Sequence, residues 1–422
     1  MDIKVRIVNG KSKIIPNREL MLLLEPAPVL NDNAHFYEMY NTGTALDLIW
    51  DTAIGDFDND GRKDILVSTQ SPYRSLAVYE STGANNSFSR VFITPQGATS
   101  GAFTKLTTGD TDGDGYQELI TGRAGSQGTI SLFENCGNNN YVQRTININH
   151  PGPNPKCILV ADTDQDGKQE IIIAYGDSSG GSIYIHEHSG HIGQNVYQLV
   201  YEYHTISYLC DMAVGDSDND GYQEIIFGLG GWGVAEPYIR RLEYTPFISR
   251  TNPEHYVHTM VSSGTGVNGL LLAPHIADVD GDGENELIFG GTGNGGAVYI
   301  FESPSNNTYQ MVDRNSGIDG NVLEIATGPL NGSDYPVIVS GSFEAEMNMW
   351  TYTGCQYCRE PYKNILSPAI FNTGAIRGLE IGYMDPGSRV DVVMGNMAAD
   401  DKIRIYEQAP PEAIYQLVND IK

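Results

Sequence analysis

A nine-residue acidic pattern that occurs five times in these 422 residues constrains the fold more than any other feature. The pattern is D-x-D-x-D-G-x-x-D/E, and its copies begin at Asp56, Asp110, Asp162, Asp216 and Asp278. The intervals between these starts are 54, 52, 54 and 62 residues. A period of this length is too long for one coil of a solenoid and suits one four-stranded blade of a β-propeller.

The segments around each copy repeat as well. An apolar strand precedes each acidic loop, as in CILVAD, and a second apolar strand that ends in a small residue follows it, as in EIIFG. A third strand usually ends in Glu, as in LAVYE, and a more polar fourth strand follows. Continuous apolar runs are typical of strands covered on both faces, whereas alternation indicates an outer strand.

Two further units, at 322–341 and 378–396, keep the strand pattern without the acidic residues. We therefore predict an all-β fold, a seven-bladed propeller of four-stranded antiparallel blades over residues 47–422. Residues 1–46 form a separate N-terminal segment that contains the strand-like LMLLLEPAP and HFYEMYNTG. This segment either closes the ring as an exchanged outer strand or belongs to an eighth blade. IRIYEQ…YQLV (403–418) offers another outer strand for the seventh unit.

Composition agrees with this prediction and excludes some partners. The 48 glycines, 20 prolines and 25 tyrosines, with only 18% charged residues, are typical of many short strands joined by tight turns. The net charge of −28 argues against binding to nucleic acid, whose phosphates need basic patches. Because no apolar run approaches about 20 residues, we expect no membrane insertion. The N-terminus lacks the apolar core of a signal peptide.

The acidic loop has the chemistry of a calcium site. Carboxylates at positions 1, 3, 5 and 9 surround a glycine at position 6 that permits a sharp turn, and the carbonyl of position 7 is free to coordinate. Such a shell of hard oxygens favours Ca²⁺. A metal-free Asp/Gly turn is the alternative for a single copy, but five complete copies favour metal. Five ions would bring the net charge from −28 to −28 + 10 = −18.

With loop, spacing and flanking strands together, the chain resembles the FG-GAP (VCBS) repeat family, whose members include the integrin α-subunit propellers. The segments IIFG (225–228) and LIFGG (287–291) are similar to the FG element, without the following GAP. The resemblance covers about residues 47–408. It implies a calcium ion between the first and second strands of a blade and partner contacts on the opposite face.

Carried over to this sequence, the resemblance implies about five calcium ions. The side-chain ligands would be Asp56, Asp58, Asp60 and Asp64; Asp110, Asp112, Asp114 and Glu118; Asp162, Asp164, Asp166 and Glu170; Asp216, Asp218, Asp220 and Glu224; and Asp278, Asp280, Asp282 and Glu286. The carbonyl ligands would be those of Arg62, Tyr116, Lys168, Tyr222 and Glu284. Units six and seven lack the ligand set, so no calcium is expected there.

The opposite face would be built by the loops between second and third strands and between blades. Aromatic side chains beside polar groups in these loops suit a sugar or a peptide, because a flat ring offers an apolar face and its neighbours supply hydrogen bonds. They are equally consistent with ordinary exposed loop residues. The candidate ligand-binding residues are Tyr73, Arg74, Arg123, Tyr175, Trp232, Glu236, Phe343 and Glu344.

The leading functional hypothesis is a calcium-stabilised, lectin-like or protein-binding module without chemistry of its own. The alternative is a carbohydrate-active enzyme such as a polysaccharide lyase, which would gather Arg, Tyr or His with carboxylates near the ring axis. No phosphate-binding glycine loop or other familiar catalytic motif occurs. Loops of this kind suit millimolar calcium and favour an extracellular or cell-surface setting.

Two minor motifs receive structural interpretations. His186, His188 and His191 could bind a transition metal, but they fall at the end of a third strand, where a solvated hairpin is expected. Cys355 and Cys358 could form a redox pair or half of a zinc site, but without a second pair we expect incidental or disulfide-linked cysteines.

Overall fold

The computed structural model describes most of the chain at the level of individual residues. The described ranges are 5–8, 11–14, 36–41, 48–70, 74–95, 103–124, 129–148, 150, 155–177, 180–230, 238–244, 256–263, 271–292, 296–355, 358–366, 374–387, 389–397 and 402–408. Within them every regular element is a β-strand, and none is a helix able to span a membrane.

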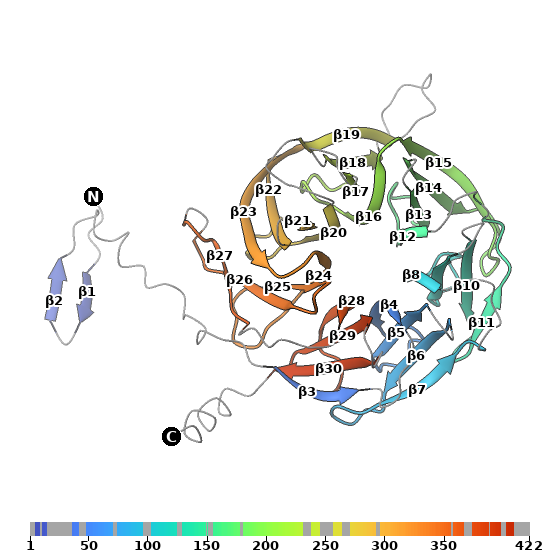
Figure 1. Ribbon diagram of the computed structural model, residues 1–422, viewed down its shortest axis with the longest axis horizontal. Helices are drawn as coiled ribbons and strands as arrows, with labels where there is room; N and C mark the ends of the chain where they lie inside the picture. The colour runs from blue at the N-terminus through green and yellow to red at the C-terminus, as the bar shows by residue number, and fades with distance from the viewer. Residues whose placement is uncertain are drawn as a thin grey trace.

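Seven four-stranded antiparallel sheets stand around a common axis, which confirms the predicted all-β, seven-bladed propeller (Figure 1). The eight-blade alternative is wrong. From the axis outward, blade one consists of β4 (Ile49–Gly55), β5 (Asp64–Thr69), β6 (Leu76–Ser81) and β7 (Phe88–Ile93), blade two of β8 (Phe103–Gly109), β9 (Glu118–Arg123), β10 (Thr129–Asn135) and β11 (Tyr141–Arg144), and blade three of β12 (Pro155–Ala161), β13 (Glu170–Asp177), β14 (Gly180–His188) and β15 (Tyr197–Thr205). Blade four consists of β16 (Tyr208–Gly215), β17 (Glu224–Gly230), β18 (Tyr238–Tyr244) and β19 (Tyr256–Ser263), and blade five of β20 (Leu271–Ala277), β21 (Glu286–Gly291), β22 (Gly296–Ser305) and β23 (Thr308–Ile318). Blade six consists of β24 (Val322–Gly328), β25 (Val337–Ser342), β26 (Met347–Tyr352) and β27 (Tyr362–Asn364), and the first three strands of blade seven are β28 (Ala375–Gly382), β29 (Asp391–Met397) and β30 (Ile403–Gln408).

The seventh blade takes its outer strand from the start of the chain. Strand β3 (Phe36–Asn41) pairs antiparallel with β30, with Tyr37 opposite Glu407. In the sequence, YQLV (415–418) was the other candidate for this place beside β30. Residues 415–418 and the LMLLLEPAP segment lie outside the described residues. Strands β1 (Val5–Val8) and β2 (Lys11–Ile14) pair only with each other and lie apart from the ring (Figure 1).

The second strand of each blade is the most deeply buried, because it is covered on both faces by neighbouring blades. All residues of β5, β17 and β21 are buried. The small residue that recurs near the end of these strands has a steric cause. A Cβ at Gly176 would lie 2.2 Å from the carbonyl oxygen of Leu209, on the innermost strand of the next blade. A Cβ at Gly228 would lie 2.6 Å from the carbonyl oxygen of Leu271.

All seven innermost strands carry a β-bulge at the same level, near their beginning. The pairing with the second strand shifts register between Ile49 and Asp51, Phe103 and Leu106, Pro155 and Cys157, Leu209 and Met212, Leu272 and His275, Val322 and Glu324, and Ile376 and Gly378. A bulge changes the direction in which side chains point from a strand. The bulges therefore determine which side chains face the ring axis.

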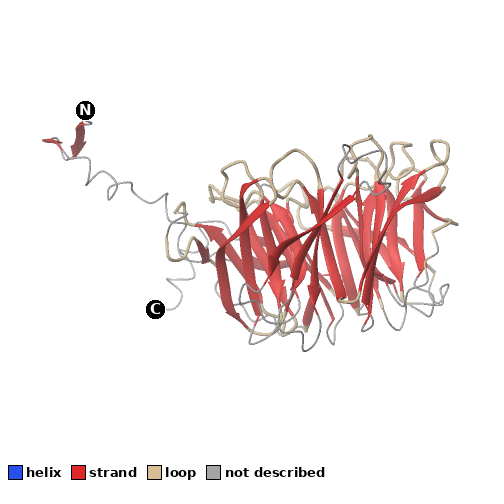
Figure 2. Ribbon diagram, turned by 90° about the horizontal axis from the view of Figure 1, so that it is seen from above, coloured by secondary structure: helices blue, strands red, loops and turns tan. Residues whose placement is uncertain are grey.

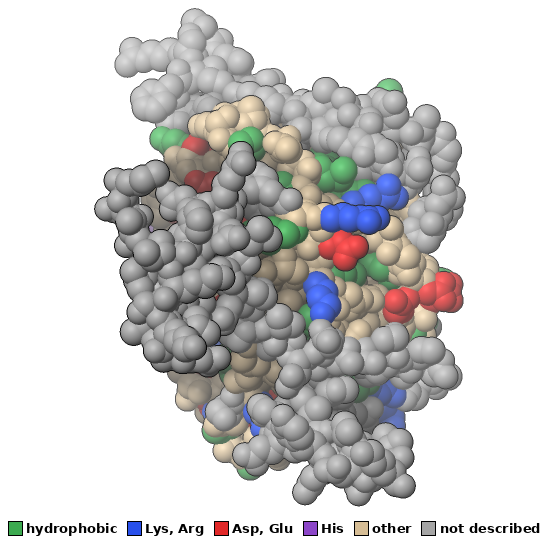
Figure 3. Space-filling view, turned by 90° about the vertical axis from the view of Figure 1, so that its left-hand side faces the viewer, with side chains coloured by type: hydrophobic (Ala, Val, Ile, Leu, Met, Phe, Trp, Pro, Cys, Tyr) green, Lys and Arg blue, Asp and Glu red, His purple; other side chains and the backbone are tan. Residues whose placement is uncertain are grey.

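The ring seen from the side is a flat drum with loops on two faces (Figure 2). On the side shown in Figure 3, the described surface carries basic and acidic side chains close together. Cys355 and Cys358 lie outside the sheets and form a disulfide. Of the two expectations for this pair, incidental or disulfide-linked cysteines, the second is therefore confirmed.

Removal of the closing strand is expected to destabilise the ring. A variant without residues 1–41 exposes the edge of β30 and loses the β3–β30 ladder, so its melting temperature should fall by roughly 5 °C or more. A variant without residues 1–14 loses only the β1–β2 pair and serves as the control. Equal melting temperatures for the two variants in differential scanning calorimetry would contradict this role of β3.

Candidate functional site

Five acidic loops connect the first and second strands of blades one to five and therefore lie on one face of the drum. In the first loop, Asp56 accepts hydrogen bonds from the backbone N–H groups of Asp60 (3.1 Å) and Gly61 (2.9 Å). Asn59 and Gly61 adopt positive φ angles of 61° and 87°, which tightens the turn. The position-1 aspartate accepts the N–H of the position-6 glycine in the other four loops too.

The last carboxylate of each loop closes the turn with one oxygen only. The backbone N–H of position 2 donates to it over 2.7 to 2.9 Å in every loop, for example Thr111 to Glu118. In the first four loops the other carboxylate oxygen is buried and accepts no hydrogen bond. These oxygens belong to Asp64, Glu118, Glu170 and Glu224.

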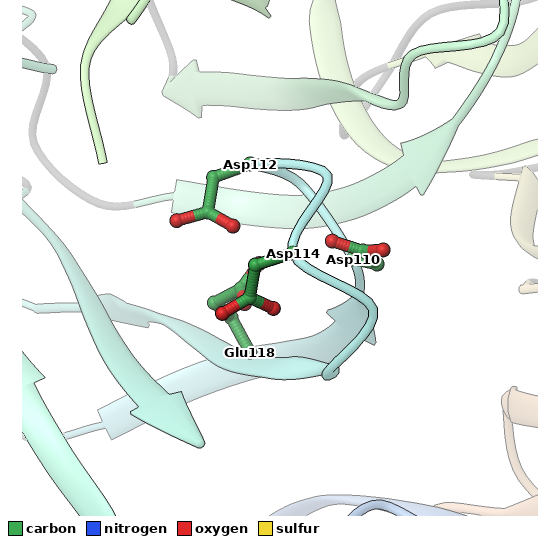
Figure 4. Close-up of side chains that lie close together, drawn as sticks. All are labelled: Asp110, Asp112, Asp114 and Glu118. Carbon is green, nitrogen blue, oxygen red and sulfur yellow. The ribbon is translucent and has the colours of Figure 1, made fainter. Parts of the chain in front are cut away.

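The orphaned oxygens lie in groups of carboxylates that could hold a cation. One oxygen from each of Asp110, Asp112, Asp114 and Glu118 lies within 4.8 Å of the others, and Figure 4 shows these side chains gathered around the turn. Both oxygens of Asp112 are also buried without a hydrogen bond. The same grouping occurs in the third and fourth loops and, with three carboxylates, in the first. Buried carboxylate oxygens without donors fit a hard divalent cation.

Burial gives these carboxylates an electrostatic cost that a cation would offset. Removal from water, reinforced by the neighbouring carboxylates, raises the pKa of Asp64 to about 7 and that of Glu118 to about 8. The pKa values of Glu170, Glu224 and Glu286 rise to about 7 or 8 for the same reasons. A bound cation would favour the ionised form of all five.

A glutamate on the third strand, outside the ligand set drawn from the sequence, joins the first cluster. An oxygen of Glu80 lies within 4.8 Å of oxygens of Asp58 and Asp60. Arg62 contacts both Asp60 and Glu80. The signal for this residue was present in the sequence, because Glu recurs at the end of the third strand.

The last two blades differ as the sequence indicated. In the sixth, Val337 occupies the place of the final carboxylate. The seventh retains Asp391, whose Oδ2 accepts the N–H of Met384 (3.1 Å), but Tyr383 and Gly387 replace the acids of positions 1 and 5.

A second group of charged residues lies at the ring axis, where the bulges turn side chains inward. The Lys105 ammonium is 3.0 Å from Glu324 Oε1 and 3.8 Å from a carboxylate oxygen of both Asp51 and Asp211. All four side chains are largely buried. Burial raises the pKa of Glu324 to about 8 even beside this lysine, and the pKa of Glu380 also rises to about 8 through burial and neighbouring carboxylates.

This axial cluster separates two cavities. One, of about 330 Å³, includes Trp50, Lys156, Tyr208 and Arg377 from the beginnings of the innermost strands and opens away from the acidic loops. We call it the axial pocket. The other, of about 300 Å³, lies toward the acidic loops and includes Glu380 in its wall. Lys105, Asp211 and Glu324 line both.

The candidate ligand-binding residues divide into three groups. Tyr73, Trp232 and Glu236 lie outside the described residues. Arg74, Phe343 and Glu344 are exposed, and Phe343 presents 52% of its surface. Arg123 is half-buried over the ring of Phe103 at 5.8 Å, while Tyr175 is buried in β13 against Tyr184 and is not available on the surface.

The three histidines of 186–191 do not meet at one metal position. His186 is buried, with its Nε2 2.7 Å from that of His150, and burial beside this second imidazole lowers its pKa to about 4. His188 instead contacts the carbonyl of Gln194, and His191 is exposed. His186 and His188 lie buried in β14, and only His191 lies in the exposed turn that was expected.

Comparison with known proteins identifies the repeats. A sequence model described as "FG-GAP-like repeat" matches residues 56–121 and 110–173. The chain contains FG-GAP-like repeats. Among solved structures, the fold is similar to BBS1N in its crystal structure with ARL6DN, with a TM-score of 0.57 and 13% identity over 90% of this chain and 98% of that one. A comparison with curated proteins finds no match.

Neighbouring FG-GAP-like repeats are joined by a hydrogen-bond chain that starts at the acidic loop. Thr111 donates its hydroxyl to Glu118 over 2.8 Å, and the Tyr197 hydroxyl of the next blade lies 2.6 Å from Thr111 Oγ1. The same chain joins Thr163 to Tyr256 and Ser217 to Tyr309. In the second, third and fourth blades the last carboxylate is therefore connected both to its loop and to the outer strand of the following blade.

Where position 2 is apolar, this chain is absent, which provides a matched control. Phe57 and Val279 occupy position 2 in the first and fifth loops, and the corresponding hydroxyls of Tyr141 and Tyr362 are buried without a hydrogen-bond partner.

Tyr197→Phe is expected to cost about 1 kcal/mol of unfolding free energy, because it removes a buried hydrogen bond. Tyr141→Phe removes a buried hydroxyl that has no partner and should be neutral or stabilising. Urea denaturation of both variants measures the difference, and equal destabilisation would show that the inter-blade chain contributes nothing.

Proposed function

We propose that the protein is a calcium-stabilised interaction module that binds a protein or a glycan on the face opposite its acidic loops. The observation that supports the calcium part is the buried carboxylate oxygen without a donor at the end of four of the loops. Burial of such an oxygen is unfavourable unless a cation or a donor completes its coordination. Hard oxygen ligands favour Ca²⁺ over metals that prefer nitrogen or sulfur.

Each loop would hold its ion with the carboxylates of positions 1, 3, 5 and 9. In the second loop these are Asp110, Asp112, Asp114 and Glu118, with the carbonyl of Tyr116 as a further ligand. The ion would neutralise the repulsion within the loop. Because Glu118 also contacts the hydroxyl that joins two blades, neutralisation would stabilise the ring as well as the loop.

Interaction is the role that this architecture supports best. A closed ring holds many loops in fixed positions on two faces, and exposed Phe343 and Glu344 lie on the face opposite the acidic loops. The structurally similar BBS1N was crystallised in complex with ARL6DN, so a related fold occurs in a complex. Glycan arrays and crosslinking to candidate proteins, on calcium-loaded protein, test this role. A Phe343→Ser variant that binds every hit like the wild type would exclude this loop from the interface.

Catalysis on an acidic polysaccharide is the second candidate, and the axial residues favour it. Lys105, Tyr208 and Arg377 lie near the axis together with the carboxylates of Asp211 and Glu324, the arrangement expected of an enzyme. A lyase assay that follows the ultraviolet absorbance of an unsaturated uronate distinguishes the candidates. Turnover that is lost in Tyr208→Phe would establish catalysis.

Removal of calcium is expected to destabilise the protein strongly. At a calcium concentration 100-fold above its dissociation constant, each ion contributes roughly 2.7 kcal/mol to the folded state. Chelation should therefore lower the melting temperature by about 5 °C or more. Elemental analysis of the loaded protein should give about five calcium ions. An unchanged melting temperature would contradict the proposal.

Replacement of one ligand should remove one site. Glu118→Gln eliminates a charge and an oxygen ligand, so the calcium stoichiometry measured at limiting calcium should fall by about one. Glu202→Gln changes an exposed glutamate on the outer strand β15 and is the control. Equal stoichiometry in the two variants would exclude a metal-binding role for Glu118.

The gain in stability from calcium should depend on pH. Without metal, the raised pKa values of Asp64, Glu118 and their counterparts let the folded state bind more protons than the unfolded state between about pH 5 and 8. The free energy of unfolding of the metal-free protein therefore falls as pH rises through this window. Calcium holds the carboxylates ionised, so it should raise the melting temperature more at pH 8 than at pH 6. An equal rise at both pH values would contradict this reasoning.

A further inference from the structure

We propose that the axial pocket binds one uronic acid unit, a sugar ring that bears a carboxylate. This inference rests on the proposed function, because it assigns a ligand class to the centre of the proposed binding face. The pocket lies at the ends of the innermost strands that are farthest from the acidic loops, and its volume of about 330 Å³ is at the lower end of the range for small-molecule sites.

The pocket is built by the β-bulges. Trp50, Lys105, Lys156 and Arg377 each lie inside a register shift of an innermost strand, and all four line the pocket. Their side chains come from four different blades. The repeated bulge therefore brings together residues that are between 51 and 327 positions apart in the chain.

Within the part of the chain that the structure describes, two cations at the pocket have no anionic partner. Among the described residues, neither Arg377 nor Lys156 takes part in a hydrogen bond or an ion pair, and Arg377 Nε is buried without an acceptor. In a chain with 53 acidic and 25 basic residues, a buried guanidinium nitrogen without an acceptor among the described residues is unexpected. A carboxylate of the ligand would supply the missing acceptor, since arginine binds carboxylates with two parallel hydrogen bonds.

Aromatic rings lie beside both cations. The Arg377 guanidinium is 4.7 Å from the ring centre of Trp50, and the Lys156 ammonium is 5.4 Å from that of Tyr208. Such contacts keep the cations in place before a ligand arrives. The rings also offer flat apolar surfaces of the kind that pack against the C–H face of a sugar.

The floor of the pocket favours hydroxyl groups over a second negative charge. Asp211 and Glu324 flank Lys105 there, and Gln70 and Thr104 line the wall. Both side chains would accept hydrogen bonds from ligand hydroxyls, and the Asp211 carboxylate would repel an additional carboxylate. This distribution suits a uronic acid, which carries one carboxylate and several hydroxyls, better than an acidic peptide.

Isothermal titration calorimetry on the calcium-loaded full-length protein tests the proposal. The probes are glucuronate and galacturonate, as monomers and disaccharides, with glucose, the uronate methyl esters and a tetraglutamate peptide as comparisons. We expect saturable binding of at least one uronate, and at least about tenfold weaker binding of its methyl ester and of glucose.

Variants test whether the binding occurs in this pocket. Arg377→Gln and Lys156→Gln should each weaken uronate binding by about tenfold, and Arg377→Lys by less than Arg377→Gln. The matched control is Arg314→Gln on the outer strand β23, which removes an arginine that lies 5.4 Å from the ring centre of Tyr299 outside the pocket. Circular dichroism and the melting temperature, measured on the same samples, establish that the variants are folded.

Several results would overturn the proposal. These are the absence of uronate binding to folded protein, equal affinity for the methyl ester, tighter binding of tetraglutamate than of any uronate, and full affinity in folded Arg377→Gln protein. None of them affects the wider proposed function, which fails instead when calcium is absent from the loops or when neither a protein nor a glycan binds the face opposite them.

Discussion

The structure depends on how it accommodates the clustered negative charge of five acidic loops, each of which joins the first and second strands of a blade. Each acidic loop brings four carboxylates to one tight turn, and the last of them is buried between strands. One oxygen of this carboxylate closes the turn through a backbone N–H group, while in four loops the other is left without a donor. One side chain can therefore define the turn with one oxygen and offer the other oxygen to the proposed metal ion. The fold and the proposed metal sites therefore cannot be separated.

The same carboxylates connect the loops to the assembly of the ring. Where position 2 is Thr or Ser, its hydroxyl lies between the last carboxylate and a tyrosine of the next blade. Where position 2 is Phe57 or Val279, no hydroxyl is present to make this connection, and at Phe57 the amide of Asn135 from the next blade donates to the backbone carbonyl over 2.7 Å instead. The blades are thus held to one another in two chemically different ways, and the repeats are equivalent in shape but not in polarity.

The sequence predicted the number of blades, the position of each acidic loop and the loss of ligands in the last two units, because these features repeat within short segments. It did not predict the axial pocket. Trp50, Lys156 and Arg377 are separated by more than 100 residues from one another, and only the bulges bring them together. A bulge changes the direction of a side chain without a distinctive residue pattern. Tyr175 shows the converse case, since a residue assigned to a loop continues a buried strand.

The pairing of β3 with β30 has a consequence for how the molecule is made. The two strands are about 360 positions apart in the chain. During synthesis β3 leaves the ribosome before every other strand of the ring, and its partner follows only after six blades have been made, because the chain is synthesised from its N-terminus. Closure of the ring therefore joins its first and its last strands, and an interrupted chain would leave an open arc with an unpaired edge available to other molecules.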